Sequence, residues 1–409
     1  MLKEEIAAKE IMGRLAFASS DELTPYLTHI NSQLRLQLAR DKRLTEEQIL
    51  ILAQDGDLFV QSRIASRADL PLLAQQHLVS NGGLAVQNAL ATNPVTDTVT
   101  LSALYTQCRD IPGSESTHGH IAAHRNCSQA LQLQIAVSGS VMGGRNLARR
   151  ADISAETCRI LIDRNAIWRD SAVFIELAKN PTADDTTLER LASSTTNSAV
   201  LEALASNPSS PLSLLVALSQ GDNSSVWANI MGNPNTPQDL IRTMMEKHGN
   251  ESYIRVQDKQ RVYPLRESLL ANPNAPRDIL EELQASYLKG NTHCRTVIAE
   301  AHTTPMPILI RFAYRDKSET VRECAAGTLL SLDDAIINAQ LASGTFSLSD
   351  TTGRGEHKCA LGDCLLDMEM SDLYQRIQGM ELTLSIENAL QTYPAELTAP
   401  TNPVRRKML

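Results

Sequence analysis

Aromatic side chains are scarce in this chain of 409 residues, at 4% of the sequence, whereas hydrophobic residues make up 42%. A core built from Leu, Ile, Val and Ala rather than from large rings suits thin layers of small helices. No apolar run approaches the roughly 20 residues of a membrane-spanning helix, and the N-terminus lacks the apolar stretch of a signal peptide. We therefore expect a soluble cytoplasmic protein.

Positive charge is not in excess either, since the formal net charge is -9. Proteins that wrap nucleic acid non-specifically usually carry the opposite balance, because neutralising phosphates supplies their affinity. Cysteine is sparse and odd in number, with seven scattered residues and none before Cys108. Most of them stand beside apolar residues, which is typical of reduced thiols packed as small hydrophobes rather than of a disulfide framework.

What the sequence has is an internal repeat. Three segments share an apolar residue seven positions before an Asn, two more apolar residues three and two positions before it, and Pro one and four positions after it. A Leu-rich stretch follows each of them. The three segments are Val200–Pro211, Val226–Pro237 and Leu265–Pro276, centred on Asn207, Asn233 and Asn272.

The chemistry of this motif predicts two short helices joined by an elbow. The apolar spacing before the Asn fits one helix face. Pro directly after the Asn disfavours helical backbone at the Asn, so the first helix ends there. The Asn amide can bond free carbonyls at the helix end. The Ser or Thr that follows is a good N-cap, and the next Pro has the φ of a first helical turn, as in Ser210-Pro211 and Thr236-Pro237.

Weaker copies of the motif occur throughout the chain. Successive copies stand about 26 residues apart, with insertions near 107–117 and 247–262. Two short helices cannot bury their apolar faces alone, but stacked neighbours can. We therefore predict an all-α fold, a right-handed α-solenoid of about ten two-helix repeats of roughly 26 residues with helical caps. The weaker elbow positions are Asp41, Arg67, Asn93, Arg125, Arg150 and Asn180.

This pattern resembles the leucine-rich repeat variant family, whose units join a short helix to an α-helix around an Asn-Pro-x-Thr-Pro elbow. The resemblance covers about residues 31–330 and is most specific over 173–285. It implies a right-handed superhelix without β-sheet. The N-terminal cysteine cluster of the iron–sulfur members has no counterpart before Cys108, so no cofactor is expected. HEAT-like packing is the structural alternative.

The ends of the chain should close the array, because open arrays need polar caps. We predict an N-terminal helical cap over 1–30, with residues 1–19 as one amphipathic helix, and the solenoid over 31–330. A loop-rich linker should cover 331–370, since Ser343–Gly362 is rich in Gly, Ser and Thr. A capping helix near 371–391 and a basic tail should complete 371–409.

Metal-ligating side chains gather at two places, and neither pattern is diagnostic. His118, His120 and His124 are a weak candidate metal set without a completing carboxylate. Cys359 and Cys364 with His357 would leave one ligand short of a usual structural zinc site. Polar residues at the edge of an inserted loop and buried thiols are the simpler interpretations. No catalytic arrangement is evident, so we predict that the protein is not an enzyme.

Basic residues recur at or near the elbows of the N-terminal half, and in a regular array equivalent positions form a row. They are Arg40, Arg67, Arg125, Arg149 and Arg150. Such a row could grip acidic side chains or phosphates, or each Arg could bond elbow carbonyls as Asn does in later repeats. The candidate binding residues are Arg67, Arg125, Arg149 and Arg150 in this row, and Tyr253, Arg255, Lys259 and Arg261 in the second insertion.

Two functions remain open from the sequence. The first is a non-enzymatic scaffold or adaptor that binds a protein partner through the solenoid surface and the inserted loops, because solenoids offer broad rigid surfaces at low ordering cost. The second is a nucleic-acid binder that uses the N-terminal Arg row and the 247–262 loop, which the acidic balance disfavours. We expect no membrane association, and the oligomeric state stays open.

Overall fold

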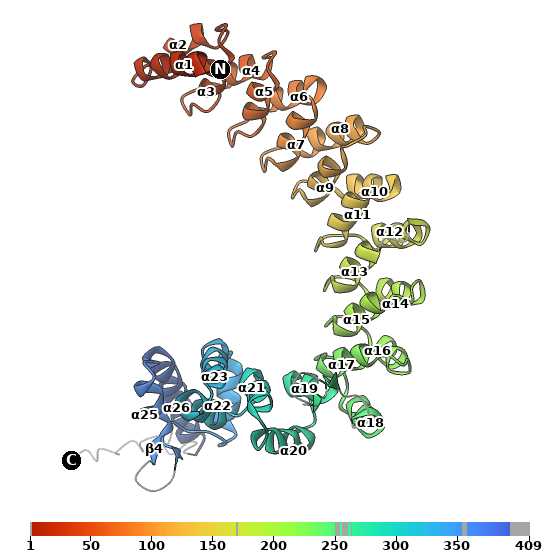
Figure 1. Cartoon of the computed structure of the whole chain (residues 1–409), viewed down its shortest axis with the longest axis vertical. Coiled ribbons are helices and arrows are strands. Elements are labelled where there is room, and N and C mark those ends of the chain that lie inside the picture. Colours follow the sequence, from red (N-terminus) through yellow and green to blue (C-terminus); the bar gives the residue numbers. More distant parts are fainter. Residues whose placement is uncertain are drawn as a thin grey trace, which may run out of the picture. The chain divides into compact units, whose positions relative to one another are not determined.

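The computed structural model describes residues 2–168, 171–249, 254–255, 261–262, 264–353 and 358–392. Over these residues the chain is almost entirely helical, and helices that are neighbours in the sequence pack against one another, as in an α-solenoid (Figure 1). The chain divides into two compact units, Met1–Val226 (unit 1) and Trp227–Leu409 (unit 2). The boundary lies inside the array that the sequence predicts for 31–330. None of the described helices is long and apolar enough to cross a membrane.

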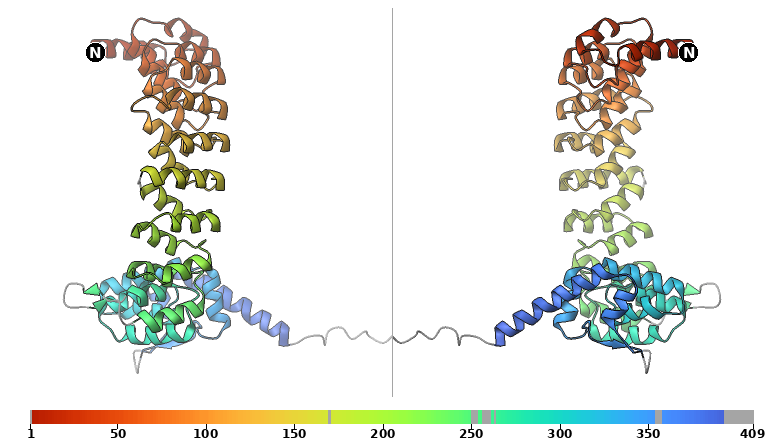
Figure 2. Two further views of the ribbon diagram at one scale, coloured as in Figure 1. Left: turned by 90° about the vertical axis from the view of Figure 1, so that its right-hand side faces the viewer. Right: turned by 90° about the vertical axis from the view of Figure 1, so that its left-hand side faces the viewer.

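Unit 1 consists of two rows of short helices. Odd-numbered helices from α3 to α15 pack against one another along the inner side of its curve, and even-numbered helices lie on the outer side (Figures 1 and 2). The helices are α1 (Leu2–Arg14), α2 (Ser20–Leu23), η1 (Thr24–Tyr26), α3 (Ser32–Leu38), α4 (Glu46–Ala53), α5 (Leu58–Ala65), α6 (Leu72–Asn81), α7 (Leu84–Thr92), α8 (Thr98–Cys108), α9 (Glu115–Ala123), α10 (Gln129–Ser138), α11 (Val141–Ala148), α12 (Ala155–Trp168), α13 (Ser171–Lys179), α14 (Asp185–Ser193), α15 (Ser198–Ser206) and α16 (Leu212–Ser219).

Local capping explains where these helices begin. Asp97 and Asp184 each accept a hydrogen bond from the third backbone N–H of the helix that follows, and Thr45 forms a capping box with Gln48. Pro211 and Pro237 stand at the N-caps of α16 and of the helix Gln238–His248, one position before the first helical turn that the sequence predicts for them. Ser210 and Thr236 therefore do not cap these helices, and their hydroxyls donate to the carbonyl oxygens of Leu204 and Ile230 in the preceding helices. Helices α7, α9 and α15 are short because the elbow residue that ends each of them, Asn93, His124 or Asn207, has extended backbone.

The elbow side chains connect each repeat to the one before it. Asn207 Oδ1 accepts a hydrogen bond from Ser209 N–H, while its Nδ2 donates to the carbonyl oxygens of Ala178 and Asn180, at 2.7 and 3.0 Å. Those two carbonyls belong to the preceding elbow, 29 and 27 residues earlier. The Asn207 side chain therefore satisfies unpaired carbonyls at the end of the preceding inner helix. The sequence predicted only that it would bond carbonyls at the end of its own helix.

The same contact recurs at other Asn elbows. The Nδ2 atoms of Asn93, Asn180 and Asn272 each donate to two carbonyl oxygens of the preceding elbow, at 2.7 to 2.9 Å. Asn233 accepts a bond from Asn235 N–H, and its own carbonyl accepts from Asn272. These four Asn side chains are buried. We call this series the elbow ladder, and it fixes the stacking of successive repeats.

One elbow position differs from the prediction by one residue. His124, and not Arg125, ends α9 with extended backbone. Its Nδ1 accepts from Asn126 N–H at 3.0 Å and its Nε2 lies 2.9 Å from the Asn93 carbonyl oxygen. The imidazole thus reproduces both the acceptor and the donor role of the Asn amide.

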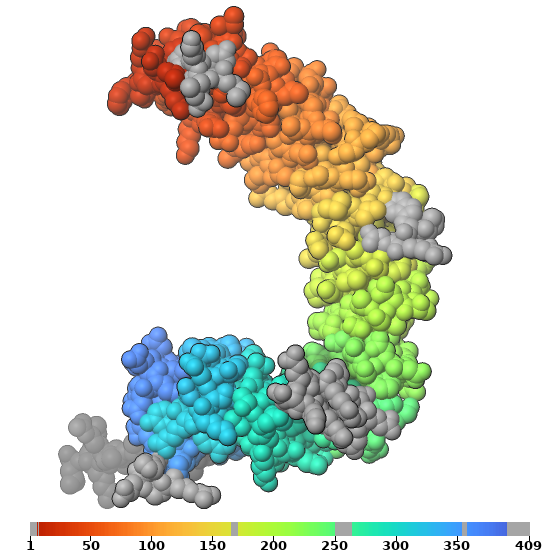
Figure 3. Space-filling model, viewed as in Figure 1, coloured from red at the N-terminus to blue at the C-terminus, as the bar shows by residue number. Residues whose placement is uncertain are grey.

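The core of unit 1 is one continuous cluster of aliphatic side chains between the two rows. It extends from Ala8 to Leu214 and includes Leu90, Leu147 and Leu204, all fully buried. The space-filling view shows the layers of this unit, from red to green, closely packed against one another (Figure 3). Close packing without large rings follows from the small side chains of the repeat.

Unit 2 is also helical, with short strand pairs in its insertions. β1 (Ile254–Arg255) pairs antiparallel with β2 (Arg261–Val262), and β3 (Thr351–Thr352) with β4 (Cys359–Ala360). Strands of this length do not form the substantial sheet that would contradict the predicted helical array. The helices are α17 (Ser224–Gly232), which includes the boundary, α18 (Gln238–His248), α19 (Pro264–Ala271), α20 (Arg277–Leu288), α21 (Thr292–Glu300), α22 (Met306–Arg315), α23 (Glu319–Ser331), α24 (Asp334–Ala342), α25 (Leu361–Asp367) and α26 (Ser371–Thr392).

The ends of the array differ from the expected layout in part. The N-terminal helix ends at Arg14, before the predicted residue 19. Helices α24 and α25 lie at the two sides of the region 331–370, where composition predicted a loop-rich linker, and the described residues between them, 343–353 and 358–360, contain no helix. Helix α26 covers the predicted helix at 371–391 and packs against α24 and α25. The basic tail lies outside the described residues.

Candidate functional site

Two of the four candidate elbow arginines serve the elbow ladder. Arg67 Nη1 donates to the carbonyl oxygens of Ala39 and Asp41, both at 2.9 Å. Its Nη2 lies 2.8 Å from Asp69, and the side chain is only 7% exposed. Because Arg has donors and no acceptor, a carboxylate two residues later completes the contact. Arg67 thus bonds elbow carbonyls as the Asn side chains do, which is the second of the two interpretations that the sequence left open for these arginines. The carbonyls belong to the preceding elbow.

Arg150 repeats this arrangement three elbows later. Its Nη1 donates to the carbonyl oxygens of Ala122 and His124, at 2.9 and 2.8 Å, and Asp152 accepts from Nε and Nη2. The Arg-x-Asp spacing in the sequence is the signal that could have identified both structural arginines. The guanidinium donors of Arg67 and Arg150 form hydrogen bonds within the protein. These two arginines are therefore not part of a row that binds a partner.

The other two candidate arginines lie nearer the surface and are also engaged. Arg125 donates from Nε and Nη2 to the Pro94 carbonyl oxygen, at 3.1 and 2.7 Å. Arg149 is 55% exposed and forms an ion pair with Glu176 at 2.7 Å. Both side chains are exposed, but the donors of each are already engaged by the protein.

The three candidate histidines have separate roles. His118 is buried, with Nε2 within 3.1 Å of Ser114 Oγ and 3.2 Å of the Cys108 carbonyl oxygen. His124 belongs to the elbow ladder, and His120 Nδ1 lies 3.4 Å from Asn88 Oδ1. Throughout the part of the chain that the structure describes, no group of three His, Cys, Asp or Glu side chains is arranged to hold a metal ion.

The second insertion and the Cys359 region are described only in part. Tyr253 and Lys259 lie outside the described residues, and Arg255 and Arg261 are described by backbone alone, as paired partners of β1 and β2. His357 also lies outside them. Burial and the neighbouring Cys359 thiol raise the pKa of Cys364 to about 12. A thiol of this kind is held protonated at neutral pH and is a poor nucleophile.

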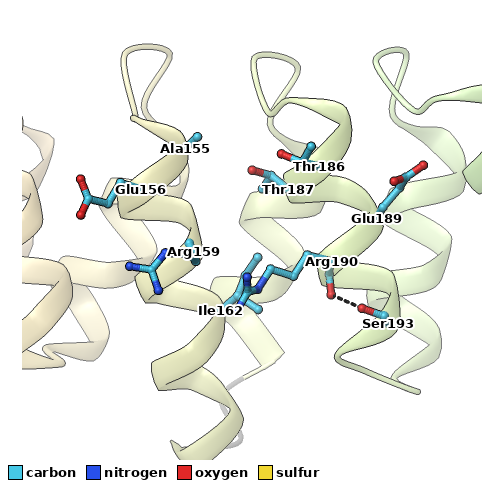
Figure 4. A pocket seen from close by; sticks show the side chains of 9 residues that line it. All are labelled: Ala155, Glu156, Arg159, Ile162, Thr186, Thr187, Glu189, Arg190 and Ser193. Carbon is cyan, nitrogen blue, oxygen red and sulfur yellow. Dashed lines mark hydrogen bonds between the residues drawn. The ribbon is translucent and has the colours of Figure 1, made fainter.

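A cavity of about 620 Å³ opens between the outer helices α12 and α14 (Figure 4). Ile162 lines it, and Arg159 and Arg190 reach it from the two helices. Both guanidinium groups pair with Asp163, at 3.3 and 2.6 Å. Because this carboxylate already compensates the two cations, the cavity offers little uncompensated charge to a ligand.

A second cavity, of about 420 Å³, lies at the C-terminal ends of the inner helices α3 and α5. Three exposed cations line it, namely Arg40, Lys42 and Arg63, which we call the basic pocket. None of the three side chains has a hydrogen bond or ion pair with the residues that the structure describes. Arg67 and Asp69, which also line the cavity, are paired with each other. The sequence reasoning missed Lys42 and Arg63, because only stacking of the two repeats brings them beside Arg40.

Basic side chains gather again farther along the inner row. Arg149 donates to Glu176, and Arg145 and Lys179 also act on this carboxylate, so that together they hold the pKa of Glu176 below its usual value. One carboxylate thus faces three cations. The inner row carries net positive charge at this second place, on a chain whose overall balance is negative.

Exposed apolar side chains mark the N-terminal ends of the same inner helices. Phe59 is 77% exposed at the start of α5. Soluble proteins rarely expose contiguous apolar patches without a function. We call the set the apolar rim, and its members are Ile30, Leu58, Phe59, Leu84, Val141 and Met142.

The apolar rim and the basic side chains share one helix face. Phe59 precedes Arg63 by four residues on α5, and Met142 precedes Arg145 by three on α11. Residues at these spacings are neighbours on a helix surface, one turn of about 5.4 Å apart. The inner face of unit 1 therefore presents an apolar edge beside a basic edge.

The residues between these two places on the inner face are small. Ser66, Thr92 and Ala123 occupy the last position before the elbow in α5, α7 and α9, where Arg40 and Arg149 stand in the flanking repeats. Their exposed, short side chains leave the surface open to another backbone. No family model, no curated protein and no solved structure matches the chain.

Proposed function

We propose that the protein is a non-enzymatic scaffold or adaptor that binds a protein partner along the inner face of unit 1. The observation that carries the proposal is the pairing of the apolar rim with uncompensated cations on that face, as with Phe59 and Arg63 on α5. A partner segment with apolar and acidic side chains would cover the apolar rim and neutralise the cations beside it.

The elbow ladder supports this function by making the surface rigid. Most elbow side chains are anchored to two carbonyls of the preceding elbow, as Asn180 is to Ala148 and Arg150. A surface that is ordered before binding loses little conformational entropy when the partner docks. We further propose that the array is a right-handed solenoid of about ten repeats of the leucine-rich repeat variant kind, and that it works in the cytoplasm.

A protein partner is favoured over nucleic acid by the state of the arginines. Arg67 and Arg150 donate hydrogen bonds to elbow carbonyls and form ion pairs with Asp69 and Asp152. Nucleic acid requires a groove whose cations follow a row of phosphates. Two separate basic places suit acidic side chains of a polypeptide better, since Ser66, Thr92 and Ala123 stand at the equivalent positions between them and Arg125 is engaged with the Pro94 carbonyl oxygen.

The experiment is quantitative affinity capture from the native cell with full-length protein and its Phe59→Ser variant, read by mass spectrometry. We expect capture of the specific partner to fall about tenfold or more, because an exposed aromatic anchor is the kind of residue that dominates interfaces. Leu73→Ser is the matched control, since Leu73 is 65% exposed on the outer row.

Both variants should keep the wild-type melting temperature, because the two side chains are exposed. Equal capture by wild type and Phe59→Ser would overturn the inner face as the binding surface. Capture that disappears on nuclease treatment would instead support the nucleic-acid function.

A further inference from the structure

We propose that the basic pocket of Arg40, Lys42 and Arg63 is a recognition site for the carboxylates of an acidic peptide segment. This inference rests on the proposed function and specifies the chemistry of the partner. The three side chains come from the C-terminal end of α3, the elbow that follows it, and α5, and they line one cavity of about 420 Å³.

The charge of the pocket is not compensated by the protein. Among the described residues that line it, Asp69 carries the only carboxylate, and Arg67 holds that carboxylate at 2.8 Å. The nearby Asp41 carboxylate is held by Arg43, which lowers the pKa of Asp41. Both acids are therefore neutralised by arginines of the elbows. Three cations remain, and their mutual repulsion favours binding of an anion.

The chemical groups of the three cations are suited to binding carboxylates. A guanidinium presents a planar fork of donors that matches a carboxylate in a bidentate contact, and the pocket has two of them beside one ammonium group. The exposed Phe59 ring lies one turn from Arg63 on the same face of α5. An acidic segment that carries an apolar residue would thus find both a charged and an apolar contact within one repeat.

A long phosphate backbone fits this place less well than a short acidic segment. The next inner helix ends in Thr92, and its elbow residue Asn93 is uncharged and buried. The cations therefore do not continue into the following repeat. A polyanion that extends beyond two repeats would leave its next charges opposite neutral side chains.

The test measures binding of a fluorescein-labelled peptide of six glutamates and one phenylalanine to the full-length protein by fluorescence anisotropy at low salt. We expect binding that weakens as salt rises, and no binding of the same peptide with glutamines. Arg40→Gln and Arg63→Gln should each weaken binding roughly three- to fivefold, and the double variant roughly tenfold or more.

Arg159→Gln on the outer helix α12 is the matched control, and it should leave the affinity unchanged. The Arg40 and Arg63 side chains form no hydrogen bond or ion pair with the described residues, and Arg159 forms only an exposed ion pair with Asp163. Circular dichroism should therefore show melting close to that of the wild type for all variants. A peptide affinity that is the same in wild type and in the double variant would overturn the inference. So would tighter, pocket-dependent binding of a single-stranded DNA oligomer of equal charge.

This experiment is independent of the capture experiment with Phe59→Ser. If the double variant binds the acidic peptide normally while Phe59→Ser still loses its partner, only the carboxylate site is wrong. If Phe59→Ser captures its partner normally, the proposed function fails by itself.

Discussion

At the scale of single residues, the elbow shows how three side-chain chemistries meet one geometric requirement. The Asn amide has an acceptor for a backbone N–H of its own turn and donors for the preceding elbow. The imidazole of His124 has one of each and satisfies the same position. The guanidinium has donors alone, and Arg67 and Arg150 are each followed by Asp two residues later.

Removing one of these amides should be costly. We expect Asn207→Ala to lower the free energy of unfolding by about 2–4 kcal/mol, because two buried carbonyls, of Ala178 and Asn180, lose their donor. Urea unfolding followed by circular dichroism measures this. Asn81→Ala is the control, since the exposed Asn81 amide reaches only its own helix, at the His77 carbonyl and ring. A loss below about 0.5 kcal/mol for Asn207→Ala would contradict the role of the ladder.

At the scale of elements, each repeat is a pair of short helices, and the residues at the helix ends decide where each helix begins and ends. Caps such as Asp184 fix where an outer helix starts, and the elbow residue fixes where an inner helix ends. Because the elbows of the Arg type depend on a carboxylate, they respond to pH. The hydrogen bonds from Arg67 and Arg150 lower the pKa values of Asp69 and Asp152.

A carboxylate with a lowered pKa in the folded state stabilises the fold above its ordinary pKa and stops doing so as pH falls through the lowered value. We therefore expect the free energy of unfolding to decrease below about pH 4. The Asp69→Asn/Asp152→Asn variant should be less stable at pH 7 and should lose less between pH 5 and pH 3. Chemical denaturation across this pH range tests the expectation.

Asp110→Asn serves as the control for the pH experiment, since Asp110 is an exposed partner of Arg109 in the loop before α9. It should show the wild-type pH dependence. An unchanged slope in the double variant would mean that the elbow carboxylates do not link stability to pH.

At the scale of the whole molecule, two compact units in one chain should unfold separately. Leu204 is fully buried in unit 1 and Leu309 in unit 2. Leu204→Ala and Leu309→Ala should each cost about 2–5 kcal/mol through lost burial and a cavity. We expect each to lower the melting temperature of a different transition in calorimetry. A single transition that both variants lower equally would contradict the division.

Several features of the protein follow from the sequence alone. The Asn-Pro elbows and the all-helical character depend on local backbone preferences and short-range hydrogen bonds. Local rules placed the starts of the helices after Ser210-Pro211 and Thr236-Pro237 only to within one residue, because the two prolines and not the hydroxyl residues are the N-caps. The same holds for the helix at 371–391, which one apolar stripe predicts. Local rules operate over a few residues, so the order of residues is enough to establish them.

Only the tertiary structure decided which side chains meet across repeats. The donors of Arg67 and Arg150 find carbonyls 26 and 28 residues earlier, and His124 replaces Arg125 at its elbow. Stacking also brings Lys42 and Arg63 beside Arg40. These contacts depend on the register in which one layer lies on the next, and that register is set by packing of the whole core rather than by any local pattern.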